Sequence, residues 1–314
     1  RQADPRFAYT EASWAEQRRY LDAAVAGLEH EDRGEAQQAL AELEVGPAPA
    51  GEAIAASEIR IDGWVITLDA ASGDIAAIAR PDGVIIAGRD GALMGYRYES
   101  YDSAELQRHL DTYLQHRLEW AVLDHDKPGL QHAATARNAV YAPDFSGVIG
   151  STAISLMPAD AHATLGAPRQ VEMTARALDG KRIELNWVLR DKPANRMPEA
   201  SFIALTPAGS TSWEYEKLGL WQDGARIARR GGGQLQGVNA VRTVAGAVRL
   251  TATPLDTPLV APANSPFMPF AAEPPDLSQG VRINLHNNKW GTNFAMWWDG
   301  DLRSRIVLEL GDLS

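Results

Sequence analysis

Residues 171–189 read VEMTARALDGKRIELNWVL, and apolar and polar residues alternate along this stretch. Apolar side chains occupy every second position on both sides of Asp179-Gly180. Successive side chains of a β-strand point to opposite faces of a sheet, and Asp-Gly is a favoured two-residue hairpin turn. The stretch therefore predicts an antiparallel hairpin with one buried face.

The same period of two recurs through most of the chain after residue 58. A second hairpin is predicted at 64–68 and 75–78, around a turn that contains Ser72-Gly73. Further strands are expected near 93–99, 138–142, 147–157, 200–206, 247–253, 281–286 and 303–310. Many short strands with few helices favour a large antiparallel β-sandwich over a βαβ fold. The glycine-rich run 229–233 lacks the Lys-Ser/Thr pair of a phosphate loop and is interpreted as a bend between strands.

Helical spacing is confined to two parts of the chain. Residues 11–28 predict an amphipathic helix that begins with the capping box Ser13–Glu16 and buries Trp14, and a second helix starts near Asp32. A further helix is expected near 103–120, with Ser103 as its cap and Trp120 on its apolar face. We therefore predict a helical remnant at 1–46, a linker at 47–57 and a sandwich region at 58–314.

Composition excludes several kinds of function. The chain has 314 residues, 30 basic against 41 acidic side chains and a formal charge of −11, with no cluster of like charges, which argues against a nucleic-acid partner. It has no cysteine, so disulfides and thiolate chemistry are excluded. No stretch approaches the roughly 18 apolar residues of a membrane span. The chain opens with Arg1 rather than Met, which is interpreted as a cut end, so no targeting signal is readable.

No catalytic or metal-binding set can be assembled from the motifs. The seven histidines lack the HExxH arrangement, and neither the pair His109 and His116 nor the neighbours His125 and Asp126 make a complete site. His286 is expected on a strand. No GxSxG elbow is present, and the acids near aromatic segments are interpreted as structural; they are Asp256, Asp299 and Asp301.

Residues 287–301, NNKWGTNFAMWWDGD, allow two interpretations. Asparagine amides and tryptophan faces are what a sugar-binding surface needs, because sugars present hydroxyls and apolar C–H faces. The alternation from Phe294 to Trp298 is equally typical of a half-buried strand. In that strand the face with Trp298 is predicted to enter the core and the face with Asn293 and Trp297 to point outward, beside Asn288 and Trp290.

Five stretches, in order along the chain, carry a family resemblance. They are SWAEQRRYLDAA (13–24), DHDKPGL (124–130), RMPEASFIAL (196–205), DTPLVAP (256–262) and NNKWGTNFAMWWDGD (287–301). Together they resemble the domain-of-unknown-function family 5054, a set of bacterial proteins similar to glycoside hydrolase family 38 α-mannosidases.

The resemblance implies a layout for the whole protein. In such α-mannosidases a catalytic barrel with zinc and a carboxylate nucleophile precedes a helical bundle and large sandwiches of the galactose-mutarotase-like supersandwich type. No stretch of this chain matches the barrel's nucleophile or zinc ligands, so no catalytic residue, metal ligand or cofactor is assigned to it. Retaining cleavage would belong to the barrel, and this chain alone is expected to be inactive.

Three functional hypotheses follow. The first is the non-catalytic C-terminal portion of a family-38-like glycosidase, which braces the upstream barrel and lines part of its sugar pocket. The second is a sandwich that binds carbohydrate by itself, and the third is a purely structural domain. Under the first two, the substrate-binding or domain-interface residues are Asn288, Trp290, Asn293 and Trp297.

Overall fold

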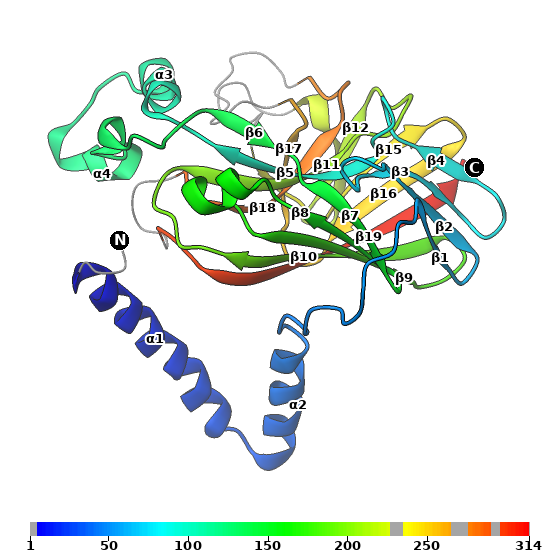
Figure 1. Ribbon diagram of the computed structural model, residues 1–314, viewed down its shortest axis with the longest axis horizontal. Helices are drawn as coiled ribbons and strands as arrows, with labels where there is room; N and C mark the ends of the chain where they lie inside the picture. The colour runs from blue at the N-terminus through cyan, green and yellow to red at the C-terminus, as the bar shows by residue number, and fades with distance from the viewer. Residues whose placement is uncertain (1–4, 227–234, 265–275, 290–295, 314) are drawn as a thin grey trace. The chain divides into compact units, whose positions relative to one another are not determined.

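The computed structural model describes residues 5–226, 235–264, 276–289 and 296–313 (Figure 1). The chain divides into two compact units, Arg1–Pro47 and Ala48–Ser314. The first is helical and the second holds all the strands of the described residues. Each unit is considered by itself below.

The helical unit consists of α1 (Pro5–Ala26) and α2 (His30–Ala41), and neither helix buries a residue. The side chain of Arg33 donates to the carbonyl oxygens of Ala26 and Leu28, both at 2.8 Å, and so caps the end of α1. The prediction that Trp14 is largely buried was wrong, because two helices alone offer too little surface to enclose it, and it is half-buried. The predicted cap at Ser13 was also wrong, since α1 begins at Pro5.

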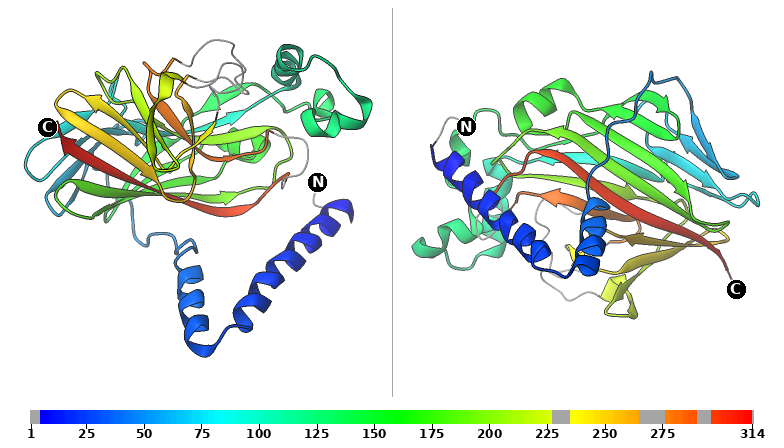
Figure 2. Two further views of the ribbon diagram at one scale, coloured as in Figure 1. Left: turned by 180° about the vertical axis from the view of Figure 1, so that it is seen from behind. Right: turned by 90° about the horizontal axis from the view of Figure 1, so that it is seen from below.

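The second unit is a sandwich of two antiparallel sheets, so the predicted fold class is confirmed (Figures 1 and 2). The strands of the ten-stranded sheet run, from edge to edge, β1 (Glu58–Ile61), β2 (Trp64–Leu68), β3 (Ile75–Ala79), β5 (Met94–Ser100), β11 (Glu199–Leu205), β18 (Val281–Asn287), β17 (Leu259–Pro262) and β14 (Gln236–Gly237), with β4 (Ile85–Ala87) beside β3 and β6 (Ala139–Tyr141) beside β5, within the described residues.

The nine-stranded sheet covers the other face of the core. Its strands, again from edge to edge and within the described ranges, are β13 (Leu220–Asp223), β12 (Trp213–Lys217), β15 (Ala240–Ala245), β16 (Val248–Pro254), β19 (Gly300–Asp312), β10 (Arg182–Lys192), β9 (Gln170–Ala177), β8 (Thr152–Leu156) and β7 (Asp144–Ile149).

The hairpin of residues 171–189 forms β9 and β10, which lie between β19 and β8 in the interior of this second sheet. Its turn is held by the Asp179 carboxylate, which accepts hydrogen bonds from the backbone N–H groups of Lys181 and Arg182, both at 2.8 Å. Its alternate apolar side chains are buried; they are Val171, Met173, Ala175, Ile183, Leu185, Trp187 and Leu189. The stretch 147–157, expected as one strand, is divided into β7 and β8 by Gly150, which has a φ of +60°.

The core lies between the sheets and is tied across them by a tryptophan. Trp64 is fully buried, and its indole N–H donates to the carbonyl oxygen of Asp179 at 3.0 Å. Fully burying a large apolar side chain contributes about 1.5–3 kcal/mol, so many such residues together stabilise the sandwich.

Short helices cluster beyond one end of the sandwich (Figures 1 and 2). The helix α3 (Ser103–Tyr113) is shorter than expected, and Asp102 rather than Ser103 caps it by accepting from the N–H of Glu105 at 2.9 Å. Trp120 is 81% exposed, so its predicted place on an apolar helix face was wrong. The remaining short elements are η1 (Glu119–Ala121), α4 (Val122–His125), η2 (Leu130–His132), η3 (Ala161–Leu165) and η4 (Gly224–Arg226). Among the described residues, no helix has the length and apolar character to cross a membrane.

Candidate functional site

Glu199, the first residue of β11, is the most deeply buried carboxylate near the end of the sandwich that carries α3 and α4. The strand EASFIAL that it begins is otherwise almost wholly apolar and lies between β5 and β18 in the middle of its sheet. Its side chain has no exposed surface. A charge in such a place is tolerated only when it is paired and hydrogen-bonded.

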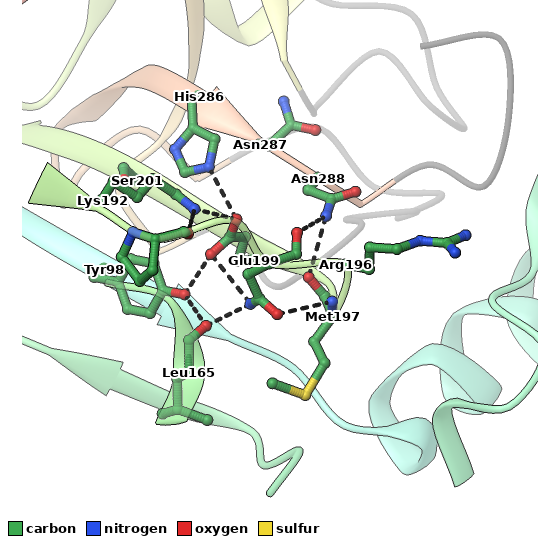
Figure 3. Close-up of polar contacts among 12 residues, drawn as sticks. Tyr98, Leu165, Lys192, Arg196, Met197, Glu199, Ser201, His286, Asn287 and Asn288 are labelled. Atoms are coloured by element: carbon green, nitrogen blue, oxygen red, sulfur yellow. Dashed lines mark hydrogen bonds and ion pairs between the residues drawn. The ribbon is translucent and has the colours of Figure 1, made fainter. Parts of the chain in front are cut away.

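Four side chains surround the Glu199 carboxylate (Figure 3). The Lys192 ammonium lies 2.7 Å from Oε1, and the Tyr98 hydroxyl lies 2.5 Å from Oε2. The amide Nδ2 of Asn195 is 3.3 Å from Oε2, and the imidazole Nε2 of His286 is 3.4 Å from Oε1. We call these five residues the Glu199 cluster.

The elements of both sheets bring the Glu199 cluster together. Lys192 is the last residue of β10 in the nine-stranded sheet, whereas Tyr98, Glu199 and His286 lie on three neighbouring strands of the ten-stranded sheet. The Lys192–Glu199 pair therefore joins the two sheets at their end. Both of its side chains are completely buried, so the pair fixes the position of the surrounding backbone.

The charges of the cluster set each other's protonation. Burial raises the pKa of Glu199, but the charge of Lys192 and the hydrogen bond from His286 outweigh it, so the net pKa is below the usual range. Burial lowers the pKa of His286 below its ordinary value, although Glu199 opposes this. Burial, then the charge of Glu199, raises the pKa of Tyr98. At neutral pH the cluster thus holds a carboxylate, a neutral imidazole and a neutral phenol.

Asn288 connects the cluster to the surface and is itself 6% exposed. Its side-chain amide donates to the carbonyl oxygens of Asn195, at 2.8 Å, and Met197, at 3.3 Å (Figure 3). Its backbone N–H donates to the carbonyl oxygen of Glu199 at 2.8 Å. Its Oδ1 accepts from the ammonium of Lys127 at 2.7 Å. Asn288 is therefore fixed on every side by hydrogen bonds.

Three stretches far apart in the chain meet at Asn288. Lys127 comes from 124–130, the carbonyl groups come from the loop into 196–205, and Asn288 belongs to 287–301. The partners Lys127 and Asn288 are 161 positions apart. These are three of the five stretches that carry the family resemblance, and the fold gathers them at one end of the sandwich.

The two described tryptophans of 287–301 differ in burial, and one of them departs from the prediction. Trp297 is 4% exposed and lies beneath the Arg196 guanidinium, which is 5.6 Å from the ring centroid. Trp298 is half-buried, and it contacts His286 edge-to-face at 5.4 Å and the Lys192 ammonium at 5.3 Å. The outward orientation predicted for Trp297 was wrong, because residues 296–299 form no strand and the alternation of faces does not apply.

The other predicted site residues cannot be placed. Trp290 and Asn293 lie outside the described residues, as does the glycine-rich run 229–233. Two of the predicted residues, Asn288 and Trp297, therefore lie in one region: Asn288 donates to the carbonyl oxygen of Met197, and Trp297 lies against the neighbouring Arg196.

Two buried nitrogen atoms at the cluster have no hydrogen-bond partner within the described part of the chain. They are the imidazole Nδ1 of His286 and the indole Nε1 of Trp298. An unpaired buried polar atom is costly, and each such atom in a native structure calls for a cause. Both belong to side chains in contact with each other, so this corner of the cluster retains hydrogen-bonding capacity for a molecule that reaches it.

The described residues contain no group of three or more His, Cys, Asp or Glu side chains that could hold a metal ion. His109 is buried and His116 is exposed, so the two do not converge on one site. Zinc, which the family-38 resemblance implies for a catalytic barrel, therefore finds no ligand set among the described residues of this chain.

The acids that were interpreted as structural are largely engaged in ion pairs. Asp256 pairs with Arg305 at 2.7 Å, and Asp301 pairs with Arg190 at 2.8 Å. Asp299 is exposed. The Glu199 carboxylate, enclosed and neutralised by Lys192, is likewise suited to holding its neighbours in place and not to attacking a substrate.

Sequence reasoning missed Glu199, Lys192 and Lys127. Glu199 carried one usable signal, a charged residue that opens an apolar strand, since buried charges are rare unless paired. Lys192 and Lys127 carried none, because their partners are distant in sequence.

Comparison with known proteins places the chain in a family without giving it an activity. No curated protein matches it. Two solved structures are similar at low identity: a galactose mutarotase-like protein from Lactobacillus casei ATCC 334 (TM-score 0.39, 10% identity, 81% of this chain and 99% of that chain) and a candidate aldose 1-epimerase from Escherichia coli K12 (TM-score 0.38, 9% identity, 82% and 98%). The model of the domain of unknown function DUF5054 matches residues 1–185. Since this match covers more than half of the chain, the chain belongs to the DUF5054 family.

Proposed function

We propose that this chain is the non-catalytic sandwich portion of a glycosidase similar to the family-38 α-mannosidases, and that the end of the sandwich around Asn288 faces its carbohydrate. The observation that carries the proposal is the meeting of 124–130, 196–205 and 287–301 at Asn288. A fold that gathers its distinctive stretches at one end concentrates polar and aromatic groups there, and such convergence is typical of a ligand-facing surface.

The chemistry of this end suits the recognition of sugar hydroxyls. The Lys127 ammonium and the indole N–H of Trp298 supply donors, and the half-buried ring of Trp298 supplies a flat apolar face. The buried Glu199 cluster holds these groups rigidly, which lowers the entropic cost of binding a flexible ligand.

The same geometry supports a non-catalytic role. Retaining glycosidases use two carboxyl groups about 5–5.5 Å apart that both reach the sugar. Glu199 has no exposed surface and is neutralised by Lys192, so it can reach no sugar. We infer that the chemistry belongs to a domain of the family-38 type outside this chain, and that zinc acts there.

One observation favours the second hypothesis, a sandwich that binds carbohydrate by itself. The unit Ala48–Ser314 contains its own core and all three stretches that meet at Asn288. A binding surface built within a single unit does not depend on a second domain for its shape.

Activity measurements test the proposal. The isolated chain is expected to hydrolyse no aryl α-mannoside or other aryl glycoside, with or without added zinc. In the full-length natural protein, Arg196→Gln is expected to lower glycosidase activity, because Arg196 lies at the surface beside Asn288, while the matched exposed control Arg60→Gln leaves it unchanged.

Two results would overturn the proposal. One is turnover by the purified isolated chain that disappears when a single acidic residue is replaced. The other is a full-length protein whose activity and carbohydrate binding are both indifferent to Arg196→Gln, which would favour the purely structural role.

A further inference from the structure

Two cations, Lys127 and Arg196, lie beside Asn288, and in the described part of the chain their hydrogen bonds go to groups other than carboxylates. Lys127 donates to two carbonyl oxygens, Oδ1 of Asn288 at 2.7 Å and the backbone oxygen of Arg196 at 3.4 Å. Arg196 donates to the sulfur of Met296 at 3.4 Å and lies over the ring of Trp297. Within the described ranges, no carboxylate lies within ion-pair distance of either cation.

Six other cations of the sandwich are matched with carboxylates, whereas the half-buried Arg89 donates to the carbonyl oxygens of Ser210 and Ser278. The matched pairs are Arg80–Asp312, Arg97–Asp74, Arg190–Glu172, Lys192–Glu199, Arg282–Glu99 and Arg305–Asp256. The whole chain carries 41 acidic side chains against 30 basic ones, so acidic partners are in excess. Lys127 and Arg196, whose charges repel each other, therefore mark a local positive site on an acidic protein.

We propose that Lys127 and Arg196 form a subsite for the anionic group of an acidic sugar, a carboxylate or sulfate carried on the ring. The proposal rests on the proposed function for the sugar and on the arrangement of the two cations for the anion. The subsite lies at the same end of the sandwich and specifies which class of sugar binds there.

The geometry suits an anion in three ways. The Lys127 ammonium has three protons, and its two carbonyl partners leave one for a ligand. The Arg196 guanidinium is a planar fork that binds carboxylate or sulfate through two parallel N–H bonds. Asn288 accepts from the Lys127 ammonium and donates to the backbone carbonyl oxygens of Asn195 and Met197, which flank Arg196. Asn288 therefore holds both Lys127 and the backbone around Arg196 in place.

Electrostatics within the site favours an anion as well. The pKa of Lys127 is lowered to about 8, mainly by burial; the charge of Glu199 opposes this shift and the charge of Arg196 adds to it. An anion bound between the two cations would relieve their repulsion. Lys127 is mostly protonated at pH 7 and loses its charge as the pH rises through about 8, so anion affinity is expected to fall over the same range. The other charged group next to it on its own segment is Asp126, whose Oδ1 accepts from the Lys127 backbone N–H at 2.7 Å.

Calorimetric titration of the whole chain tests the inference with three probes at low salt: an oligosaccharide of uronic acid, a neutral manno-oligosaccharide and inorganic sulfate. We expect the uronic acid oligosaccharide to bind more tightly than the neutral one. We expect Lys127→Met and Arg196→Gln each to weaken that binding about tenfold, Arg196→Lys to weaken it less, and the control Arg60→Gln to leave it unchanged. Raising the pH from 7 to 9 should weaken binding in the natural sequence and have little effect in Lys127→Met.

The outcomes separate this inference from the proposed function. Equal binding of neutral and acidic oligosaccharides overturns the anion subsite and leaves the carbohydrate-facing role in place. Acidic-sugar binding that is indifferent to both substitutions also overturns it, because the anion then binds elsewhere. Sulfate that binds as tightly as the acidic oligosaccharide shows an anion site without sugar recognition and contradicts the ligand class. Arg196 is exposed, so Arg196→Gln keeps the test valid if Lys127→Met impairs folding.

Discussion

At the scale of single residues, Glu199 stabilises the sandwich only in balance with Lys192. Replacing Glu199 by Gln leaves a buried ammonium without its counter-charge, and removing one partner of a buried ion pair typically costs about 3–5 kcal/mol. We expect Glu199→Gln to lose stability in that range by urea unfolding. The double variant Glu199→Leu with Lys192→Met is expected to lose less, because it removes both charges together. A single variant as stable as the natural chain would contradict the burial of this pair.

The two tryptophans of 297–298 also differ in a testable way. Trp297 is 4% exposed, whereas Trp298 is half-buried. Truncating a buried tryptophan costs about 3–5 kcal/mol, so Trp297→Ala is expected to lower the unfolding free energy more than Trp298→Ala. Parallel urea titrations measure the difference, and the reverse order would show that Trp297 faces outward after all.

Lys289 makes stability depend on pH. Burial and the charge of Arg282 lower its pKa to about 7, against the opposing charges of Glu99 and Glu105. Between this value and its unfolded pKa the unfolded state binds more protons, so the unfolding free energy rises as the pH increases from 7 to 9. Lys127 acts in the same direction, with a pKa of about 8. We expect Lys289→Met to reduce this rise without abolishing it, as measured by denaturant unfolding at several pH values. An unchanged slope would contradict the burial of this ammonium.

At the scale of elements, α1 buries none of its residues. Its Leu21 is 52% exposed, and its Trp14 is half-buried. Trp14→Ala is therefore expected to change the melting temperature of this chain only slightly, far less than the about 3–5 kcal/mol of a buried tryptophan would imply. A large loss in thermal unfolding would show that Trp14 is enclosed in solution.

The elements that were predictable from the sequence are those whose pattern is local. Alternating apolar residues around Asp179-Gly180 predicted the hairpin of β9 and β10, and the structure contains it. The division at Gly150 and the helix start at Pro5 were missed because a turn and a cap depend on one or two residues. Trp297 was wrongly predicted to point outward, because period-two reasoning holds only inside a strand and residues 296–299 form none.

The candidate site was much less predictable than the fold. Asn288 was identified because the stretch 287–301 is rich in asparagine and tryptophan. Its partner Lys127, however, is 161 positions away, and His286 and Glu199 are 87 positions apart. Contacts of this kind are set by the order of strands in the sheet, which no local pattern encodes. The charge that opens the apolar strand at Glu199 was the single local hint.

At the scale of the whole molecule, the sandwich contains its own complete core. The unit Ala48–Ser314 holds every buried apolar residue of the described chain, and the helical unit holds none. A chain that begins at residue 48 is therefore expected to fold cooperatively, with a melting temperature close to that of residues 1–314. Loss of cooperative unfolding by calorimetry would show that the helices contribute to the sandwich core.

The proposed carbohydrate-facing end of the sandwich around Asn288 can be examined by hydrogen–deuterium exchange of the full-length natural protein, with and without manno- and uronic acid oligosaccharides. On addition of one of these ligands we expect slower exchange in 124–130, 195–199 and 286–289, and no change in the distant β1–β2 hairpin. Unchanged exchange in all three segments, or protection confined to the cavity of about 370 Å³ lined by residues 55–57 and 145–147, would contradict the proposal.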